Sequence, residues 1–153
     1  RIPENLKSGG LCVEIAEKYE RLGLYGQAVK WVDRYYPQTQ QIELLEPFVD
    51  SVRYLSDREQ QQAIDTADSW LQTRPDNAKL LMYLGQLAYG KRLWGKAQGY
   101  LEASIAIKPT VSARLALAKV FDETEQLQKA EAQRKLVLES VSDEEEPLAL
   151  ENK

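Results

Sequence analysis

Four alanines recur along this chain at nearly constant spacing, and this repetition constrains the fold more than any other feature. They lie 35, 34 and 33 residues apart, at Ala28, Ala63, Ala97 and Ala130. Pro75 and Pro109 are also 34 residues apart. A unit of this length accommodates two helices and a turn but cannot bury its own apolar face, so it must stack on copies of itself. The spacing therefore predicts an all-α solenoid of about four stacked units.

The best-defined unit runs from Pro75 to Pro109 and contains two helical patterns that meet near Gly90. Its small residues, Gly85 on the first helix and Ala97 on the second, allow the two helices to cross closely. The other positions that fit the unit are Leu81, Leu84, Ala88, Leu101 and Ser104. This order of small and large residues is that of the tetratricopeptide repeat (TPR), so we predict a right-handed α-solenoid of about four TPRs.

The repeat frame gives a TPR-repeat domain over residues 1–141. Its repeats are expected at about residues 9–40, 41–75, 76–109 and 110–141. Helices are expected at about 11–22, 25–36, 41–55, 57–73, 111–122 and 126–140, with two more inside the third repeat. Residues 142–153 contain the like-charge run Asp143–Glu146, interrupted by Pro147. We expect this acidic C-terminal segment to be a solvated, flexible tail that is dispensable for stability.

Several residues mark the expected helix ends. Gly23 suits the left-handed end of the first helix, and Pro37 is expected to stop the second. Ser56 or Asp57 is expected to cap the fourth helix, with Glu59 placed for a capping box.

The helix expected at 41–55 fits the repeat poorly. The frame places Pro47 and Asp50 where core residues belong. The apolar stripe follows other positions, at Leu45, Phe48, Val52 and Leu55. Either this helix is rotated relative to the others or Pro47 begins a new helical segment; a third interpretation, an exposed apolar groove, is less favoured.

Composition argues against catalysis, and we predict that the chain is not an enzyme. It has no histidine, which removes the commonest general base and metal ligand. Cys12, the only cysteine, falls on an apolar helical face and is expected to be a small buried thiol. The tryptophans are expected to pack between helices.

With 24 acidic and 20 basic residues, the chain is a poor candidate for binding nucleic acid. No apolar run reaches the length of a membrane helix.

Two stretches carry a family resemblance, RPDNAKLLMYLGQLA at Arg74–Ala88 and LWGKAQGYLEAS at Leu93–Ser104. With the four repeats and the irregular segment LLEPFVDSVRYL, the chain resembles the C-terminal TPR region of HemY, a bacterial inner-membrane protein associated with protoheme synthesis. The resemblance implies a scaffold or regulator of late heme biosynthesis on the cytoplasmic side of the inner membrane. It also implies a membrane anchor upstream of Arg1.

The resemblance supplies no catalytic residues, and we expect no cofactor. Cys12 is followed by Val13, so the Cys-Pro heme-regulatory dipeptide is absent. Without histidine, axial ligation of heme would fall to Cys12, Met82 or a tyrosine.

The first helices of stacked TPRs line a concave face, where a protein or peptide partner is expected to bind. The candidate residues are Glu17, Arg21, Lys79, Met82, Gln86, Tyr89 and Lys119. We predict that Gln86, Tyr89 and Lys119 point into one groove. The alternative for this face is an ordinary solvated surface, with Met82 and Tyr89 partly packed on the next repeat.

Two other function classes remain open at this level. The chain could be a TPR assembly co-factor of another bacterial envelope system, such as lipopolysaccharide or pilus assembly. An enzyme is the contrasting class, and it conflicts with the composition. The partner in the favoured interpretation would be a heme-biosynthesis enzyme.

Overall fold

A computed structural model describes the backbone of residues 10–151 and the side chains of residues 10–142. The described chain is all helical, and no strand occurs in it. Its elements are α2 Leu11–Arg21, α3 Tyr25–Thr39, the 3₁₀ helix η1 Ile42–Leu44, α4 Leu45–Val52, α5 Asp57–Trp70, α6 Ala78–Gly90, α7 Trp94–Ile107, α8 Val111–Glu123 and α9 Leu127–Glu151.

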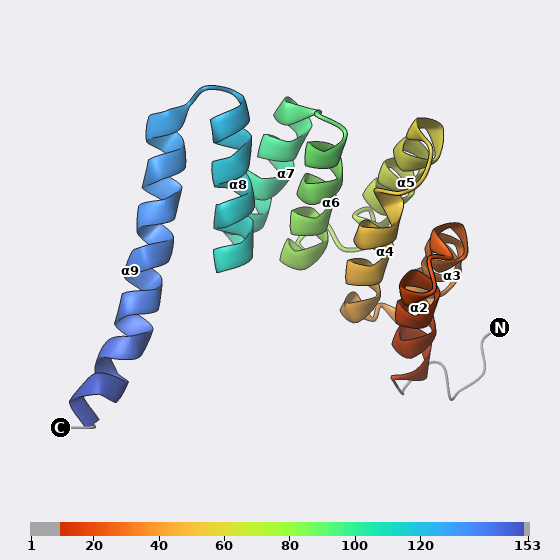
Figure 1. Cartoon of the computed structure of the whole chain (residues 1–153), viewed down its shortest axis with the longest axis horizontal. Coiled ribbons are helices and arrows are strands. Elements are labelled where there is room, and N and C mark those ends of the chain that lie inside the picture. The colour runs from red at the N-terminus through yellow and green to blue at the C-terminus, as the bar shows by residue number, and fades with distance from the viewer. Residues whose placement is uncertain (1–9, 152–153) are drawn as a thin grey trace.

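The helices form four antiparallel pairs, α2–α3, α4–α5, α6–α7 and α8–α9, which stack into one row (Figure 1). Each first helix also contacts the next, α2 with α4, α4 with α6 and α6 with α8. The helices α3, α5 and α7 lie behind them in the view of Figure 1. The predicted all-α solenoid of four helix pairs is thus confirmed.

The small residues lie where the helices of a pair cross. Ala28, Ala97 and Ala130 are completely buried, and Ala63 is 3% exposed. Gly85 faces Leu101 so closely that an added Cβ would lie 2.6 Å from the Leu101 Cγ. The hydroxyl of Ser104 donates a 2.7 Å hydrogen bond to the Ala78 carbonyl, which ties α7 to the start of α6. The repeat positions inferred from small residues are therefore the packing positions of the solenoid.

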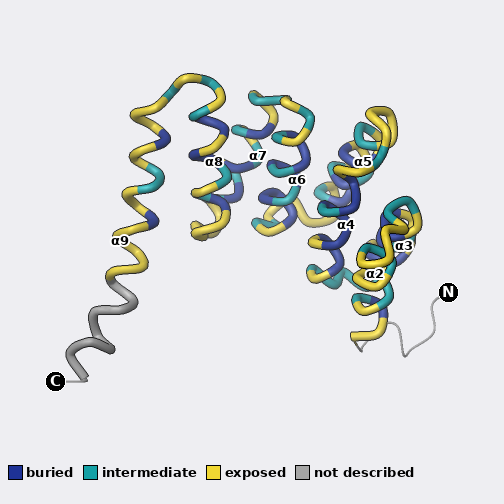
Figure 2. Tube along the Cα trace, in the orientation of Figure 1, coloured by how far each residue is buried: buried dark blue, intermediate teal, exposed yellow. Residues whose placement is uncertain are grey.

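The core is continuous along the row, as the buried stripes in Figure 2 show. One apolar cluster joins α2 through α6, and a second joins α6 through α9. Trp70 packs against Tyr36 and Phe48, with ring centroids 4.6 and 5.3 Å apart. Trp31 donates a 2.9 Å hydrogen bond to the carbonyl of Cys12, which is fully buried. These aromatic residues pack between helices, as predicted.

The prediction that Pro37 stops the second helix is wrong. Helix α3 continues to Thr39 with Pro37 inside its last turn, and Gln40 ends it in the left-handed region at φ 55°. Proline removes one backbone hydrogen bond here, but the Gln40 N–H still reaches the Tyr36 carbonyl at 2.8 Å. The side chains of Gln38 and Thr39 also donate to carbonyls one turn earlier. The last turn therefore forms around the proline, supported by hydrogen bonds to the carbonyls of Arg34, Tyr35 and Tyr36.

The irregular third helix is broken rather than continuous. The 3₁₀ turn η1 precedes α4, which begins at Leu45. Pro47 is buried in the first turn of α4, where a missing N–H removes no helical bond. Phe48 and Val52 are buried, as the apolar stripe predicted.

Two other helix ends follow the sequence signals, whereas the end of the last helix does not. Ser56 caps α5, and its hydroxyl and the Glu59 carboxylate form the predicted capping box. Gly23 has φ 76°, as expected after α2. At the other end, α9 does not stop near Ser140 but continues to Glu151. The side chains of residues 143–153 lie outside the described part, so a flexible tail over residues 142–153 remains a prediction.

Candidate partner-binding face

The surface formed by α2, α4, α6 and α8, here called the first-helix face, carries three neighbouring hollows. They are named here the central, acidic and lower hollows. Ser112 lines both the central and the lower hollow, and Lys79 lines both the lower and the acidic hollow. The three hollows are therefore neighbours along the stacked first helices.

The central hollow has a volume of about 640 Å³ and lies between α4, α6 and α8. It is lined by Val49, Val52, Arg53, Gln60, Gln86, Leu87, Tyr89, Gly90, Lys91, Ser112, Leu115, Ala116 and Lys119. Consecutive first helices lie side by side, and this stacking brings α6 and α8 to one cavity. Gln86, Tyr89 and Lys119, which were predicted to share a groove, all line it.

Tyr89 is held in place on the wall of the central hollow. Its ring meets Trp94 edge-on at 5.3 Å, and its hydroxyl lies 3.5 Å from a carboxylate oxygen of Glu123. Burial, followed by the nearby Glu123 carboxylate, raises the pKa of the Tyr89 hydroxyl above its usual value. The phenol is therefore neutral at physiological pH and offers a hydroxyl to a bound group.

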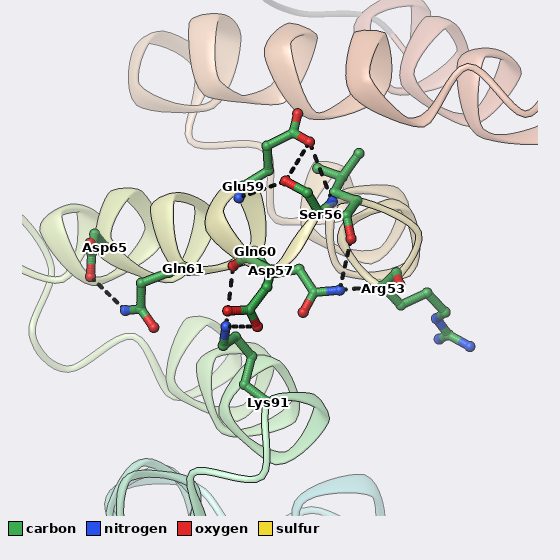
Figure 3. A network of polar contacts seen from close by, with 9 residues as sticks. Arg53, Ser56, Asp57, Glu59, Gln60, Gln61, Asp65 and Lys91 are labelled. Atoms are coloured by element: carbon green, nitrogen blue, oxygen red, sulfur yellow. Dashed lines mark hydrogen bonds and ion pairs between the residues drawn. The ribbon is translucent and has the colours of Figure 1, made fainter.

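The cations around the central hollow differ in how they are paired. Arg53 makes a 3.0 Å ion pair with Asp50. Lys91 pairs with the Asp57 side chain at the start of α5, as Figure 3 shows. Gln60 donates to the carbonyls of Arg53 and Leu55 at 3.2 Å, which fixes the turn between α4 and α5. Lys119 is exposed and makes no ion pair within the described residues. It is the cation at this hollow that is free to meet a ligand.

The acidic hollow, about 400 Å³, lies between α2, η1–α4 and the start of α6. Its lining residues are Val13, Glu17, Glu20, Ile42, Glu43, Glu46, Pro47, Asp50, Lys79 and Tyr83. Burial raises the pKa of the Glu20 carboxyl, and repulsion from Asp50, Glu46 and Glu17 raises it further. Like charges are thus concentrated at this end of the face.

The lower hollow, about 650 Å³, lies between the turns that precede α6 and α8. Lys79 and Met82 line it, but Met82 is only 6% exposed and packs in the cluster shared with α8. The expectation that Met82 is an outward residue is therefore corrected: α8 stacks on α6 and covers most of its side chain. Arg21 is exposed at the end of α2 and lines none of the three hollows.

Sequence reasoning missed the acidic residues of η1 and α4. It included Glu17 and Lys79 among the candidate residues but treated Asp50 as a misplaced core residue. Glu43, Glu46 and Asp50 are spaced by three and four residues, which places them on one side of a helix. That spacing was the available signal for an acidic face.

The described residues offer no metal cluster and no exposed thiol. They contain no cluster of three or more potential ligands arranged to hold a metal ion. Cys12 is fully buried, and burial raises the pKa of its thiol, so a reactive thiolate is disfavoured. None of the described helices combines the length and the apolarity needed to cross a membrane.

Comparisons with known proteins identify the fold. No protein-family model and no curated protein matches the chain. TTC0263, a TPR protein of Thermus thermophilus, superposes with a TM-score of 0.69 at 22% identity, over 84% of this chain and 71% of that one. A MamA structure gives a TM-score of 0.66 at 19% identity, over 90% of this chain and 81% of that one. MamA of Desulfovibrio magneticus RS-1 gives a TM-score of 0.64 at 15% identity, over 84% of this chain and 72% of that one. The chain has the fold of a TPR solenoid.

Proposed function

We propose that the chain is a non-catalytic protein-interaction module and that a segment of a partner protein binds along its first-helix face. The central hollow carries this proposal. There, Gln86, Tyr89 and Lys119 surround a cavity of about 640 Å³ whose floor includes Val52 and Leu87. An apolar floor edged by amide, phenol and charged groups suits a helical or extended peptide. The TPR-like fold supports the proposal, because stacked repeats present extended binding surfaces.

The finer proposal is that this module belongs to a HemY-like inner-membrane protein and scaffolds or regulates late heme biosynthesis. It is supported by the stretches Arg74–Ala88 and Leu93–Ser104, which cover most of α6 and α7 in the third repeat. Under this proposal the module works on the cytoplasmic side of the membrane and binds a late heme-synthesis enzyme.

The direct test is a double substitution in the central hollow, Tyr89→Ala with Lys119→Glu. We expect it to weaken binding of a purified late heme-synthesis enzyme by roughly thirtyfold or more, since one hot-spot tyrosine is commonly worth ~2 kcal/mol or more. The measurement is isothermal titration calorimetry, with a melting curve to verify folding.

A matched control is Tyr54→Ala with Lys96→Glu, which makes the same changes at exposed positions that line none of the hollows. The control should bind like the wild type. Unchanged affinity in the folded test variant would place the site elsewhere. If the wild-type chain binds no such enzyme, the heme-synthesis role is refuted, and the interaction function is then decided by the peptide experiment below.

A further inference from the structure

The first-helix face is divided by charge. Five carboxylates line the acidic hollow, together with Lys79 as its one described cation: Glu17, Glu20, Glu43, Glu46 and Asp50. The central hollow has the reverse character, since its described lining contains Arg53, Lys91 and Lys119 but no carboxylate. Arg53 and Lys91 are already paired with Asp50 and Asp57. One face therefore presents a negative end over α2 and α4 and, at its other end, Lys119 of α8, a cation without an ion pair within the described residues.

The two ends belong to one continuous surface because α4 contributes to both. Its Pro47 and Asp50 line the acidic hollow, while Val49 and Val52 line the central one. Arg53 and Asp50 are paired at 3.0 Å and mark the boundary. A single bound segment can therefore contact the acidic hollow, the apolar floor and Lys119 in sequence.

The protein itself leaves much of this charge unbalanced. Glu17, Glu20, Glu43 and Glu46 form no ion pair within the described residues. Their mutual repulsion is visible at Glu20, whose carboxyl pKa is raised by burial and by three neighbouring carboxylates. A cation placed in this hollow would relieve that repulsion, and an anion would increase it.

We propose that the occupant of the first-helix face is a partner segment with a defined charge pattern. Basic side chains lie against the acidic hollow, an apolar side chain enters the central hollow, and an acidic side chain meets Lys119. This inference rests on the proposed function and adds the chemical class of the ligand. Stacked helices are about 8–10 Å apart, so the path from α2 to α8 is about 30 Å. An extended segment of about nine residues spans it.

The probe is a displayed library of random twelve-residue peptides selected against the whole chain. We expect the enriched peptides to carry net positive charge, with two or more Lys or Arg residues toward one end and an apolar residue between them and an acidic residue. Labelled copies of the enriched peptides are then titrated by fluorescence anisotropy. Their affinity should fall as salt concentration rises, because the pairing is partly exposed to water.

The decisive variant is Glu17→Lys with Glu46→Lys, which reverses two charges of the acidic hollow. Each reversal replaces an attraction by a repulsion, and we expect about a tenfold loss of affinity. The matched control is Glu102→Lys with Glu139→Lys, exposed residues of α7 and α9 outside the three hollows, with the same change in net charge. The control should leave affinity unchanged. Should the test variant fail to fold, Glu17→Gln with Glu46→Gln replaces it.

The outcomes separate this inference from the function on which it rests. Enriched peptides of neutral or negative charge, or basic peptides with equal affinity for both charge-reversal variants, would overturn the inference. The proposed function would stand if such peptides still lost affinity with Tyr89→Ala and Lys119→Glu. It would fall if the selected peptides bound that variant as well as the wild type, or if the selection yielded no binder.

Discussion

The close approach of two helices at Gly85 and Leu101 predicts an unusual response to a single methyl group. In a helix interior, alanine is favoured over glycine by about 1 kcal/mol. At Gly85, however, the added Cβ would lie 2.6 Å from Leu101 Cγ and 2.8 Å from one Cδ. Leu101 is fully buried, and Cγ is a branch point rather than a flexible tip, so the helices themselves must shift. Such overpacking costs about 1–3 kcal/mol.

We therefore expect Gly85→Ala to lower the free energy of unfolding by up to about 2 kcal/mol, measured by urea denaturation followed by circular dichroism. Gly99 in α7 is the matched control, because a Cβ there meets nothing within 4 Å. Gly99→Ala should raise the free energy of unfolding by about 0.5–1 kcal/mol.

A double-mutant cycle identifies the clash as the cause. Leu101→Ala alone should cost about 2–5 kcal/mol, and it leaves the space that the new methyl group needs. In that background Gly85→Ala should become stabilising by about 1 kcal/mol, because only the propensity gain remains. If Gly85→Ala stabilised the wild-type chain as much as Gly99→Ala does, the helix crossing would be misplaced and the reasoning wrong.

Three further substitutions test other features of the fold, each by its unfolding free energy. Burial raises the pKa of Asp33 to about 6, so the folded chain binds the proton more tightly than the unfolded chain, and stability is lost as pH rises from about 4 to about 6. Asp33→Asn should remove that pH dependence and raise the free energy of unfolding at neutral pH by about 1–2 kcal/mol, a value reduced because the side chain is partly exposed. A pH profile of stability parallel to that of the wild type would contradict this. The hydroxyl of the fully buried Ser51 has no hydrogen-bond partner in the described part of the chain. Ser51→Ala should therefore raise the free energy of unfolding by up to about 1 kcal/mol, and a lower value than in the wild type would mean that the hydroxyl does form a hydrogen bond. Ser56→Ala removes the capping box of α5 and should cost about 1 kcal/mol, whereas no loss would mean that the cap is dispensable.

Much of the fold could be predicted because the repeat imposes the same packing at every unit. A helix crossing admits only small side chains, so the spaced alanines and Gly85 located the crossings. Ser56 and Glu59 located a helix start by a purely local rule. The shared position of Gln86, Tyr89 and Lys119 followed from parallel stacking of first helices. What they bind is not encoded by stacking, and their role in binding remains a prediction.

Proline was the main source of error because its local cost was overridden by tertiary contacts. Pro37 lies in the last turn of α3, where buried Tyr36 anchors the helix. The side chains of the next two residues add hydrogen bonds to carbonyls one turn earlier. The exposure of Met82 was also misjudged, because it depends on how closely α8 approaches α6. Such distances between repeats cannot be read from the period of one repeat.

The least regular part of the solenoid also contributes to two of the hollows of the proposed binding face. Helix α4 is short, follows a 3₁₀ turn and contributes residues to both the acidic and the central hollows. It carries the unpaired Ser51 hydroxyl, and it places Glu46 and Asp50 where they repel Glu20. A regular repeat would avoid both costs, and proteins often retain such local conflicts at functional sites. The departure of this segment from the repeat pattern is therefore a further argument for the proposal that it takes part in recognition.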